Sequence, residues 1–491
     1  MTLLHDPLIS DQAGRLFSLP GLFAALSRGE VSDLPALRPH QRAAWHMTCV
    51  QIAALACWQA GQGDLAKDED GWRDMLLGLT QGEEAPWALI PQEGEPGFLQ
   101  PADPGALKWT QVATPDALDL LITSRNHDLK REIAAEAEAQ DWLFALVSLQ
   151  VSEGYGGRGN HGIARMNGGS SSRAMVARVP MGAGLRIDPS AWFRRDVTAL
   201  LRARAEGRHQ HIGTEGGPAL IWTLPWPEGR KLSIGALDPW FVEVCRRVRL
   251  YRDAAGAIRA MRATSTAGRI EAKAQKGAVG DPWAPVHKGE GKAFTLSSGD
   301  FDYRTIDKLY FGTDWERPLL STAQPDDADG PVLLLFEALA RGNSKTEGFR
   351  SRVVVMPRAL NRREVDAGVF SKEQIADIAE GAKALNTALA LVVAGGADPS
   401  KEDRVLVRSS GDRMQARLDA VFFDYLGARL EGTPREAFQA EVRAQARATF
   451  EAEWQGYAVD ALFRHRAEAR ARRTLDIMLA RLRTEEMEDD A

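Results

Sequence analysis

The carboxy-terminal quarter of the chain constrains the fold most strongly, because its composition suits little other than helix. From Ser371 to Glu488 glycine and proline become sparse, while alanine, leucine, arginine and glutamate dominate. Helix-start signals occur at SKEQ, where Ser371 is the expected cap, and at TPRE, where Thr433 is the expected cap before Pro434. The expected helices cover residues 371–393, 412–430, 433–454 and 459–483. Four helices joined by short or medium loops pack most simply as a bundle.

The rest of the chain has a mixed character. A chain of 491 residues exceeds what one hydrophobic core usually supports, so two domains are expected. Apolar residues at helical spacing predict a helix over residues 39–60 and a second over 132–151. Short apolar runs broken by Gly, Pro and Trp predict strands and long loops between residues 176 and 301. The predicted fold class is α+β, with a large mixed domain over residues 1–365 and a four-helix bundle over 366–491.

Composition limits where the protein works and what it binds. With 44% hydrophobic and 26% charged residues the chain is of the globular type. Cys49, Cys57 and Cys245 form no CxxC pair, which indicates a reducing compartment. No signal peptide or run of roughly 20 apolar residues is present, so we expect a cytoplasmic protein without membrane contact. The net charge of −6 means that any contact with nucleic acid must be local.

One stretch combines glycine and arginine without any acidic residue. Residues 154–187 contain nine glycines and five arginines, and no Asp or Glu. Glycine allows the backbone to approach a phosphate or a base edge, and Arg158, Arg165 and Arg173 are expected to neutralise phosphates. The alternatives are a mobile surface loop and the phosphate loop of a nucleotide-binding enzyme. GYGGRG is not a Walker motif, because no GK[ST] follows it.

A second basic patch covers residues 341–363, which carry seven Lys or Arg and the single acid Glu347. A polar turn is expected at its start, between a predicted helix over 332–340 (VLLLFEALA) and a predicted strand over 350–357 (RSRVVVMP). Such a turn can project into a groove of nucleic acid. An ordinary hairpin with a solvated basic strand is the alternative.

Signals for catalysis or metal binding are weak. His209 and His211 form an HxH pair, but no further ligands stand at a matching spacing. No HExxH, GxSxG or paired-carboxylate motif occurs, so neither an active site nor a cofactor is expected. The arginine-rich segment 463–473 is either a solvated helix face or a contact for nucleic acid or a partner subunit.

Several short motifs follow one another in a characteristic order. MTLLHDPLI opens the chain, LITSRNHDLK precedes a predicted helix, GYGGRGNHG follows that helix directly, and RGNSKTEGF lies ahead of the terminal bundle. In this order and over nearly the full length the chain resembles the CasA family, the large subunits of type I-E CRISPR Cascade complexes. The resemblance implies a non-catalytic subunit of an RNA-guided antiviral complex. Such a subunit recognises the protospacer-adjacent motif from the minor groove and helps to open the duplex into an R-loop.

The resemblance assigns roles to particular residues. The glycine loop of the family matches Gly154, Tyr155, Gly156 and Gly157, where backbone amides are expected to approach the groove, with Arg158 beside them. The strand-separating wedge matches Asn343, Ser344, Lys345, Thr346 and Glu347. The glutamine that some members carry in the wedge is absent, so Thr346 or Lys345 takes its place.

Two further elements of the family have matches here. The groove-reading lysine has no unique counterpart, and its candidates are Arg269, Lys273 and Lys276 in GRIEAKAQKG. The loop near the guide matches Arg125, Asn126 and His127.

The resemblance also implies partners. These are the guide RNA, the double-stranded DNA target, the backbone, handle-binding and small subunits of the complex, and a recruited helicase–nuclease. Two rival functions remain open: a nucleotide-dependent or nucleic-acid-processing enzyme that uses the Gly-rich loop, and a purely structural scaffold subunit.

Overall fold

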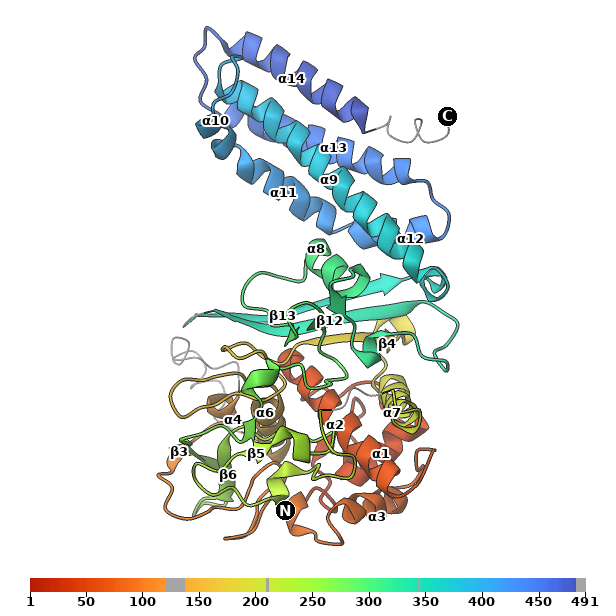
Figure 1. The fold of residues 1–491 in the computed structure, drawn as a ribbon, viewed down its shortest axis with the longest axis vertical. Helices are drawn as coiled ribbons and strands as arrows, with labels where there is room; N and C mark the ends of the chain where they lie inside the picture. Colours follow the sequence, from red (N-terminus) through yellow and green to blue (C-terminus); the bar gives the residue numbers. More distant parts are fainter. Residues whose placement is uncertain (120–136, 209–211, 343–344, 483–491) are drawn as a thin grey trace. The chain divides into compact units, whose positions relative to one another are not determined.

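The computed structural model describes residues 1–119, 137–208, 212–342 and 345–482 (Figure 1). It divides the chain into two compact units. Unit 1 consists of Met1–Phe301, Asp314–Ala328 and Leu333–Val353, and unit 2 of Asp302–Thr313, Asp329–Val332 and Val354–Ala491. Unit 1 contains helices and sheets and unit 2 is mostly helical, so the predicted α+β class is confirmed.

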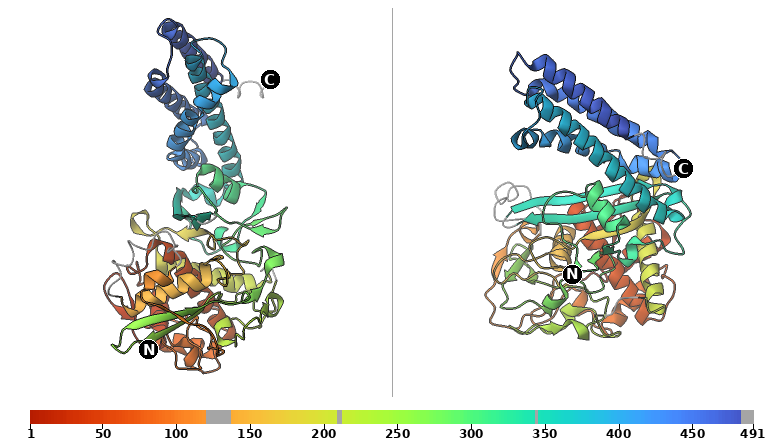
Figure 2. Two further views of the ribbon diagram at one scale, coloured as in Figure 1. Left: turned by 90° about the vertical axis from the view of Figure 1, so that its left-hand side faces the viewer. Right: turned by 45° about the horizontal axis from the view of Figure 1, so that its top comes forward.

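Helix α2 (Pro39–Gln59) is the central helix of unit 1, as predicted. Almost every residue from His40 to Cys57 is buried, which is the property of a helix covered on all sides. Its neighbours are α3 (Glu69–Leu79), α6 (Ala139–Ser152) and α7 (Pro189–Ala205), and α1 (Leu19–Arg28) packs on α3 and α7. Figure 2 shows the same helices from two further directions.

Helix α7 was not expected from the sequence, although its start signals are present. Asp188 accepts a hydrogen bond from the amide of Ala191, and Pro189 stands at the first helical position. The surrounding Gly- and Pro-rich sequence obscured these signals. The helix is important for the fold because its buried face packs against α2.

The largest sheet of unit 1 has the strand order β13 (Lys345–Met356), β12 (Val332–Gly342), β4 (Met175–Pro180). The prediction of a helix over VLLLFEALA was therefore wrong, because this segment belongs to β12. Residues 332–340 are all buried, and all of them except Glu337 are apolar. Such a run does not distinguish a buried strand from a buried helix.

Smaller sheets complete unit 1. One has the order β3 (Thr110–Val112), β7 (Ile258–Ala263), β6 (Arg247–Arg252), and another β10 (Lys292–Ala293), β9 (Val286–His287), β11 (Trp315–Glu316). Two-stranded pairs are formed by β1 (Ile9–Ser10) with β2 (Leu16–Phe17) and by β5 (Leu232–Ser233) with β8 (Ile270–Glu271). The expectation of strands and long loops between residues 176 and 301 agrees with these elements, but it missed α7 within the same range.

Unit 2 is the expected helical bundle, in which α9 (Glu364–Val393) contacts each of the other bundle helices (Figure 1). The others are α10 (Lys401–Leu406), α11 (Arg408–Asp419), α12 (Phe422–Leu430), α13 (Arg435–Glu453) and α14 (Arg464–Arg481). The second expected helix is broken into α11 and α12, and α10 is additional. The expected domain boundary at residues 365/366 falls inside α9.

Both predicted helix caps in unit 2 were wrong. Ser371 lies within α9, where its hydroxyl donates to Asp307 over 2.6 Å. Helix α13 begins after Pro434, and no described side chain caps it. Tertiary contacts hold these helices instead, because Asp377 of α9 accepts two 3.0 Å hydrogen bonds from Arg435 of α13.

None of the helices in the four described ranges combines the length and the hydrophobicity that crossing a bilayer requires.

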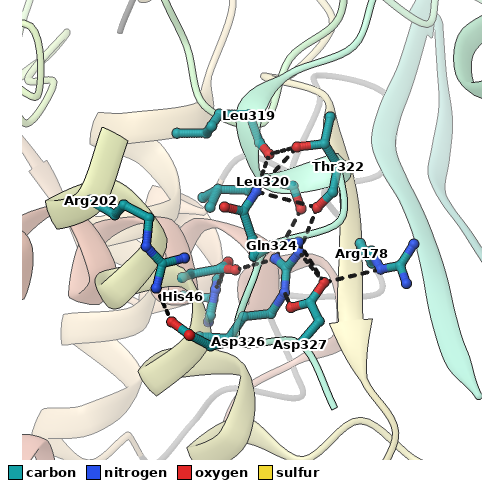
Figure 3. A network of polar contacts seen from close by, with 11 residues as sticks. His46, Arg178, Arg202, Leu319, Leu320, Thr322, Gln324, Asp326 and Asp327 are labelled. Carbon is teal, nitrogen blue, oxygen red and sulfur yellow. Dashed lines mark hydrogen bonds and ion pairs between the residues drawn. The ribbon is translucent and has the colours of Figure 1, made fainter. Parts of the chain in front are cut away.

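A buried ionic network fastens the loop before β12 to α2, α7 and β4 (Figure 3). Arg195 of α7 donates to Asp327 at 2.6 Å, to Asp196 at 2.8 Å and to the carbonyl of Thr322 at 2.8 Å. Arg178 of β4 approaches Asp327 at 3.2 Å. His46 of α2 lies 2.9 Å from Asp196, and burial lowers the pKa of His46, so this imidazole is neutral. The two arginines and two aspartates therefore balance one another.

We expect Asp327→Ala to destabilise the protein by about 3 kcal/mol. This is the lower end of the range for breaking a buried pair, because Arg195 keeps Asp196 as a partner. The matched control is Asp326→Ala, which removes an ion pair with Arg202 whose carboxylate is 63% exposed and costs at most about 1 kcal/mol. Chemical denaturation followed by tryptophan fluorescence measures both. Equal destabilisation would show that the network does not hold this loop.

Candidate nucleic-acid interface

The Gly-rich stretch begins directly after α6, and its first amides are used by the fold itself. Gly154 donates its amide proton to the carbonyl of Ser171 at 3.0 Å, and Tyr155 donates to that of Gly169 at 2.7 Å. Gly156 donates to the carbonyl of Asn160 at 2.9 Å. The expectation that these three amides approach a groove is therefore corrected, because each already has an internal acceptor.

The tip of the loop, Gly157–Gly159, remains open. Asn160 donates to the carbonyl of Gly157 at 2.9 Å and closes the turn. In the part of the chain that the structure describes, the amides of Gly157, Arg158 and Gly159 have no acceptor. Arg158 is exposed and Tyr155 is 44% exposed. Consecutive free amides beside a guanidinium suit a ligand that offers negative charge or hydrogen-bond acceptors.

Other glycines of the stretch are required by close packing of the chain on itself. A Cβ on Gly154 would lie 2.4 Å from the carbonyl oxygen of Ser171, and one on Gly159 would lie 2.6 Å from Cβ of Thr264. Gly157 differs, because nothing lies within 4 Å of its Cβ position and its φ is +106°. Gly154 and Gly159 therefore shape the loop, and Gly157 faces open space.

The three arginines that were expected to neutralise phosphates divide into one exposed and two buried side chains. Arg173 is bidentate to Asp281 at 2.6 and 2.8 Å. Arg165 donates to the carbonyl of Phe241 at 2.8 Å, and burial lowers its pKa to about 10. The expectation that Arg165 and Arg173 contact phosphates was wrong, since both lie in the core beneath the loop. Arg158 is the member of the trio that stays at the surface.

Residues 264–277 run alongside the Gly-rich stretch. The amide of Ser265 donates to the carbonyl of Gly159 at 2.9 Å, and Nε2 of His161 lies 3.2 Å from the carbonyl oxygen of Ser265. Further along, a Cβ on Gly277 would lie 2.5 Å from the backbone carbon of Met166. The structure thus brings together the glycine loop and the segment that carries the three candidates for groove reading.

The three candidates differ in exposure. Arg269 is buried and donates to the carbonyls of Leu224 at 2.9 Å and Pro225 at 3.0 Å, and burial lowers its pKa to about 10. It holds the segment in place and does not face solvent. Lys273 and Lys276 are both exposed. Lys276 has a φ of +48° and accepts a 3.0 Å hydrogen bond from the amide of Ala293.

The hairpin that carries the expected wedge is fastened to the same stretch. The hydroxyl of Ser171 donates to the carbonyl of Leu339 in β12 at 2.6 Å, and the amide of Leu339 donates to the hydroxyl of Ser172 at 2.7 Å. Three residues beyond Leu339, or about 10 Å along the strand, β12 ends at Gly342. Lys345 and Thr346 begin β13, whereas Asn343 and Ser344 lie outside the described residues.

Other predicted residues are not among those that the structure describes. Arg125, Asn126 and His127 fall outside the described residues, as do His209 and His211. Among the residues that are described, no three His, Cys, Asp or Glu side chains are grouped to hold a metal ion.

Arginines of α14 have local partners. Arg470 donates to Asp398 at 2.7 Å and to the carbonyl of Gly396 at 2.8 Å, and Arg472 donates to Glu468 at 2.9 Å. These contacts favour the solvated-face interpretation of segment 463–473.

Solved structures of CRISPR-associated proteins share this architecture. The crystal structure of Cse1 from Acidimicrobium ferrooxidans matches with a TM-score of 0.68 and 16% identity over 99% of this chain and 98% of that one. CasA from Thermus thermophilus matches with a TM-score of 0.65 and 16% identity over 98% of this chain and 99% of that one. Thermobifida fusca Cse1 matches with a TM-score of 0.64 and 15% identity over 98% of both chains. The chain has the Cse1 fold.

Both units are included in the Cse1 fold, since the matched regions cover nearly all of each protein. No protein-family model and no curated protein matches the sequence. The buried Arg165, Arg173 and Arg269 are the functional supports that composition missed. A sequence signal exists for Arg173, which the mostly apolar run AMVARVP follows directly, whereas Arg269 stands in the polar segment GRIEAKAQKG.

We expect alanine substitutions at the two kinds of loop glycine to reduce the stability of the protein by different amounts. Gly154→Ala should destabilise the protein by about 3 kcal/mol, because its Cβ meets the carbonyl oxygen of Ser171. Gly157→Ala should cost about 1 kcal/mol, the strain of a left-handed alanine in open space. Urea unfolding compares the two variants. A larger loss for Gly157→Ala would contradict the assignment of Gly157 to the open tip.

Proposed function

We propose that the chain is the large, non-catalytic subunit of a type I-E RNA-guided surveillance complex in antiviral defence. It recognises the protospacer-adjacent motif from the minor groove and helps to open the duplex. The observation that carries the proposal is the open tip Gly157–Gly159 on a stretch against which the segment with the exposed Lys273 and Lys276 packs, through Ser265 at one end and Gly277 at the other. The Cse1 fold over the whole length supports it.

The chemistry of the tip suits the floor of a minor groove. Every base pair presents acceptors there, the N3 of purines and the O2 of pyrimidines. The free amides of Gly157, Arg158 and Gly159 are donors on a backbone thin enough to enter, and the guanidinium of Arg158 is free for a flanking phosphate. Because the acceptor pattern is degenerate, such a site tolerates related motifs. A local site of this kind also accounts for binding by a protein of net charge −6.

Within the neighbouring segment we assign groove reading to Lys276 and phosphate contact to Lys273. Lys276 directly precedes Gly277, which packs against the Gly-rich stretch, and its carbonyl is held by Ala293. This support fixes the left-handed backbone from which its side chain departs. Lys273 lies in the preceding 3₁₀ turn, Lys273–Gln275.

The remaining roles follow the resemblance. Lys345 and Thr346 replace stacking at the first base pairs and so act as the wedge. Arg125, Asn126 and His127 contact the guide RNA or the adjoining duplex. The chain assembles with the backbone, handle-binding and small subunits of the complex, and the mixed domain recruits the helicase–nuclease.

Gly157→Asp tests the proposal. A carboxylate at the open tip would face DNA phosphates, so we expect at least a tenfold loss of target binding by the assembled complex with guide RNA. Electrophoretic mobility shifts measure it, and Gly157→Ala is the control for backbone strain. Binding retained by Gly157→Asp would contradict minor-groove contact and favour a scaffold.

The alternative function, a nucleotide-dependent or nucleic-acid-processing enzyme, predicts a different experimental result. Turnover of ATP, or cleavage of DNA with Mg²⁺, by the purified chain that Gly157→Asp abolishes would support the rival and overturn the proposal.

The roles assigned to the two lysines predict different kinds of loss in DNA binding. Lys276→Ala should weaken binding by about 1–3 kcal/mol and reduce discrimination between motifs, since it removes a contact to base edges. Lys273→Ala should weaken all motifs equally and lower the salt dependence by about one phosphate contact. Binding isotherms at several salt concentrations on matched and altered motifs distinguish them. Exchanged phenotypes would reverse the assignment.

A further inference from the structure

A small cavity of about 10 Å³, into which a few polar side chains project from a largely apolar lining, lies within unit 1 beside Ser152, Ser172 and Arg173. Its walls come from α2, the end of α6, the end of the Gly-rich stretch, and both strands of the β12–β13 hairpin. The lining residues that matter are His40, Ser152, Ser172, Arg173, Glu337 and Phe349. The volume corresponds to a single water molecule. Residues on both sides of the glycine loop and the stem of the hairpin thus line one small cavity.

Glu337 of β12 is the acidic group that lines this cavity. It is 8% exposed, and the hydroxyl of Ser351 on the neighbouring strand donates to its carboxyl group at 2.9 Å. This cross-strand hydrogen bond joins β12 to β13 close to the glycine loop. Two residues further along β12, Leu339 holds Ser171 and Ser172 of the Gly-rich stretch.

The cations around Glu337 are engaged elsewhere. Arg173 is bidentate to Asp281, and Arg42 lies 3.4 Å from Asp33 with half of its side chain exposed. His40 of α2 lies 2.8 Å from Asp119 and so faces another carboxylate. Because each of these cations already faces another carboxylate, an ionised Glu337 would add a negative charge that none of them neutralises. Burying such a charge without a partner is costly.

The pKa of Glu337 agrees with this geometry. Burial raises it from 4.5 to about 7, and the hydrogen bond from Ser351 and the charge of Arg42 offset part of that effect. The group therefore exchanges its proton close to neutral pH.

We propose that the protonation state of Glu337 controls how firmly the β12–β13 hairpin is attached to the Gly-rich stretch beside the glycine loop. We call Glu337 the pin. When Glu337 is protonated it is neutral, and the hairpin stem keeps its hydrogen bonds to Ser171 and Ser172. Ionised, it draws water into the cavity and loosens the stem. The tip of this hairpin carries the wedge in the proposed function, so the pin sets how firmly the wedge is held.

The sign of the pH effect follows from the raised pKa in the folded state. The folded protein binds the proton more tightly than the unfolded chain, so the contribution of Glu337 to stability is complete below pH 4.5. It is lost as the pH rises through about 7. Above that value no further change comes from this group.

Thermal melting of the full chain between pH 5 and pH 8.5 tests the pin. Glu337→Gln replaces the protonated acid by a neutral side chain of the same shape, and Glu83→Gln, an exposed glutamate of the same unit, is the matched control. We expect Glu337→Gln to melt as the unchanged protein does at pH 5 and several degrees higher at pH 8, whereas Glu83→Gln follows the unchanged protein throughout. A constant difference across this pH range would overturn the proposal.

Ser351→Ala provides a second variant that does not touch the carboxyl group. The hydroxyl of Ser351 favours the ionised form, so its removal should move the midpoint of the pH dependence upward. Hydrogen exchange of the β13 peptide 345–356, corrected for intrinsic rates, should increase between pH 6 and pH 8 in the unchanged protein and not in Glu337→Gln. An unchanged midpoint in Ser351→Ala, or equal exchange in both proteins, counts against the pin.

The link to strand opening rests on the proposed function and has a separate readout. In the assembled complex, a fluorescent base analogue beside the motif should report opening that varies between pH 6 and pH 8, and opening that is constant with Glu337→Gln. If melting and exchange behave as expected but DNA is not opened at any pH, the pin stands and the proposed function fails. Opening with the same pH dependence in both proteins would separate Glu337 from the wedge.

Discussion

The buried ion pair between Arg173 and Asp281 is the constraint on which the site depends. It joins the end of the Gly-rich stretch to the segment before Trp283, and Arg173 also reaches Gln51 of α2 at 3.3 Å. Gln51 in turn donates to the carbonyls of Trp240 and Phe241, the latter of which also accepts from Arg165. Two charged groups taken out of water contribute little net stability, but they permit one arrangement only. The pair therefore specifies where the glycine loop leaves the core.

The loop itself is an open tip on an ordered base. Its first three amides are used in internal hydrogen bonds, and glycine is required at Gly154 by the carbonyl of Ser171. That arrangement leaves Gly157–Gly159 free and holds them in one geometry, which lowers the entropic cost of binding. The mixed unit thus offers a narrow surface of donors instead of a broad basic face, in keeping with its acidic overall charge.

Three segments far apart in the sequence meet at the Gly-rich stretch. Residues 264–277 lie along one side through Ser265, and the hairpin stem is bound through Leu339 to Ser171 and Ser172. The small cavity with Glu337 lies where the stem, the loop root and α2 come together. A change in hydration at this point reaches two of the elements that the proposed function assigns to the duplex. In the proposed function this chain therefore has both a contact surface for the duplex and, in Glu337, a group that controls that surface.

Sequence alone determined those features that depend on neighbours along the chain. The spacing of apolar residues predicted α2, and the scarcity of glycine and proline after Ser371 predicted the terminal bundle. The absence of acids from residues 154–187 singled out the candidate site, and the order of short motifs suggested the family whose fold the structure shows. The apolar run of β12 was ambiguous, since a central strand and a buried helix have the same composition.

Only the tertiary structure decided which charges are available. Arg173 and Arg158 look alike in the sequence, yet Arg173 meets an aspartate 108 residues away and Arg158 meets solvent. Arg269 likewise proved to be a buried support, and Glu337 a buried acid whose neighbouring cations pair with other carboxylates. The free energy of a charged side chain is set by the partners and the water around it, and long-range folding supplies both.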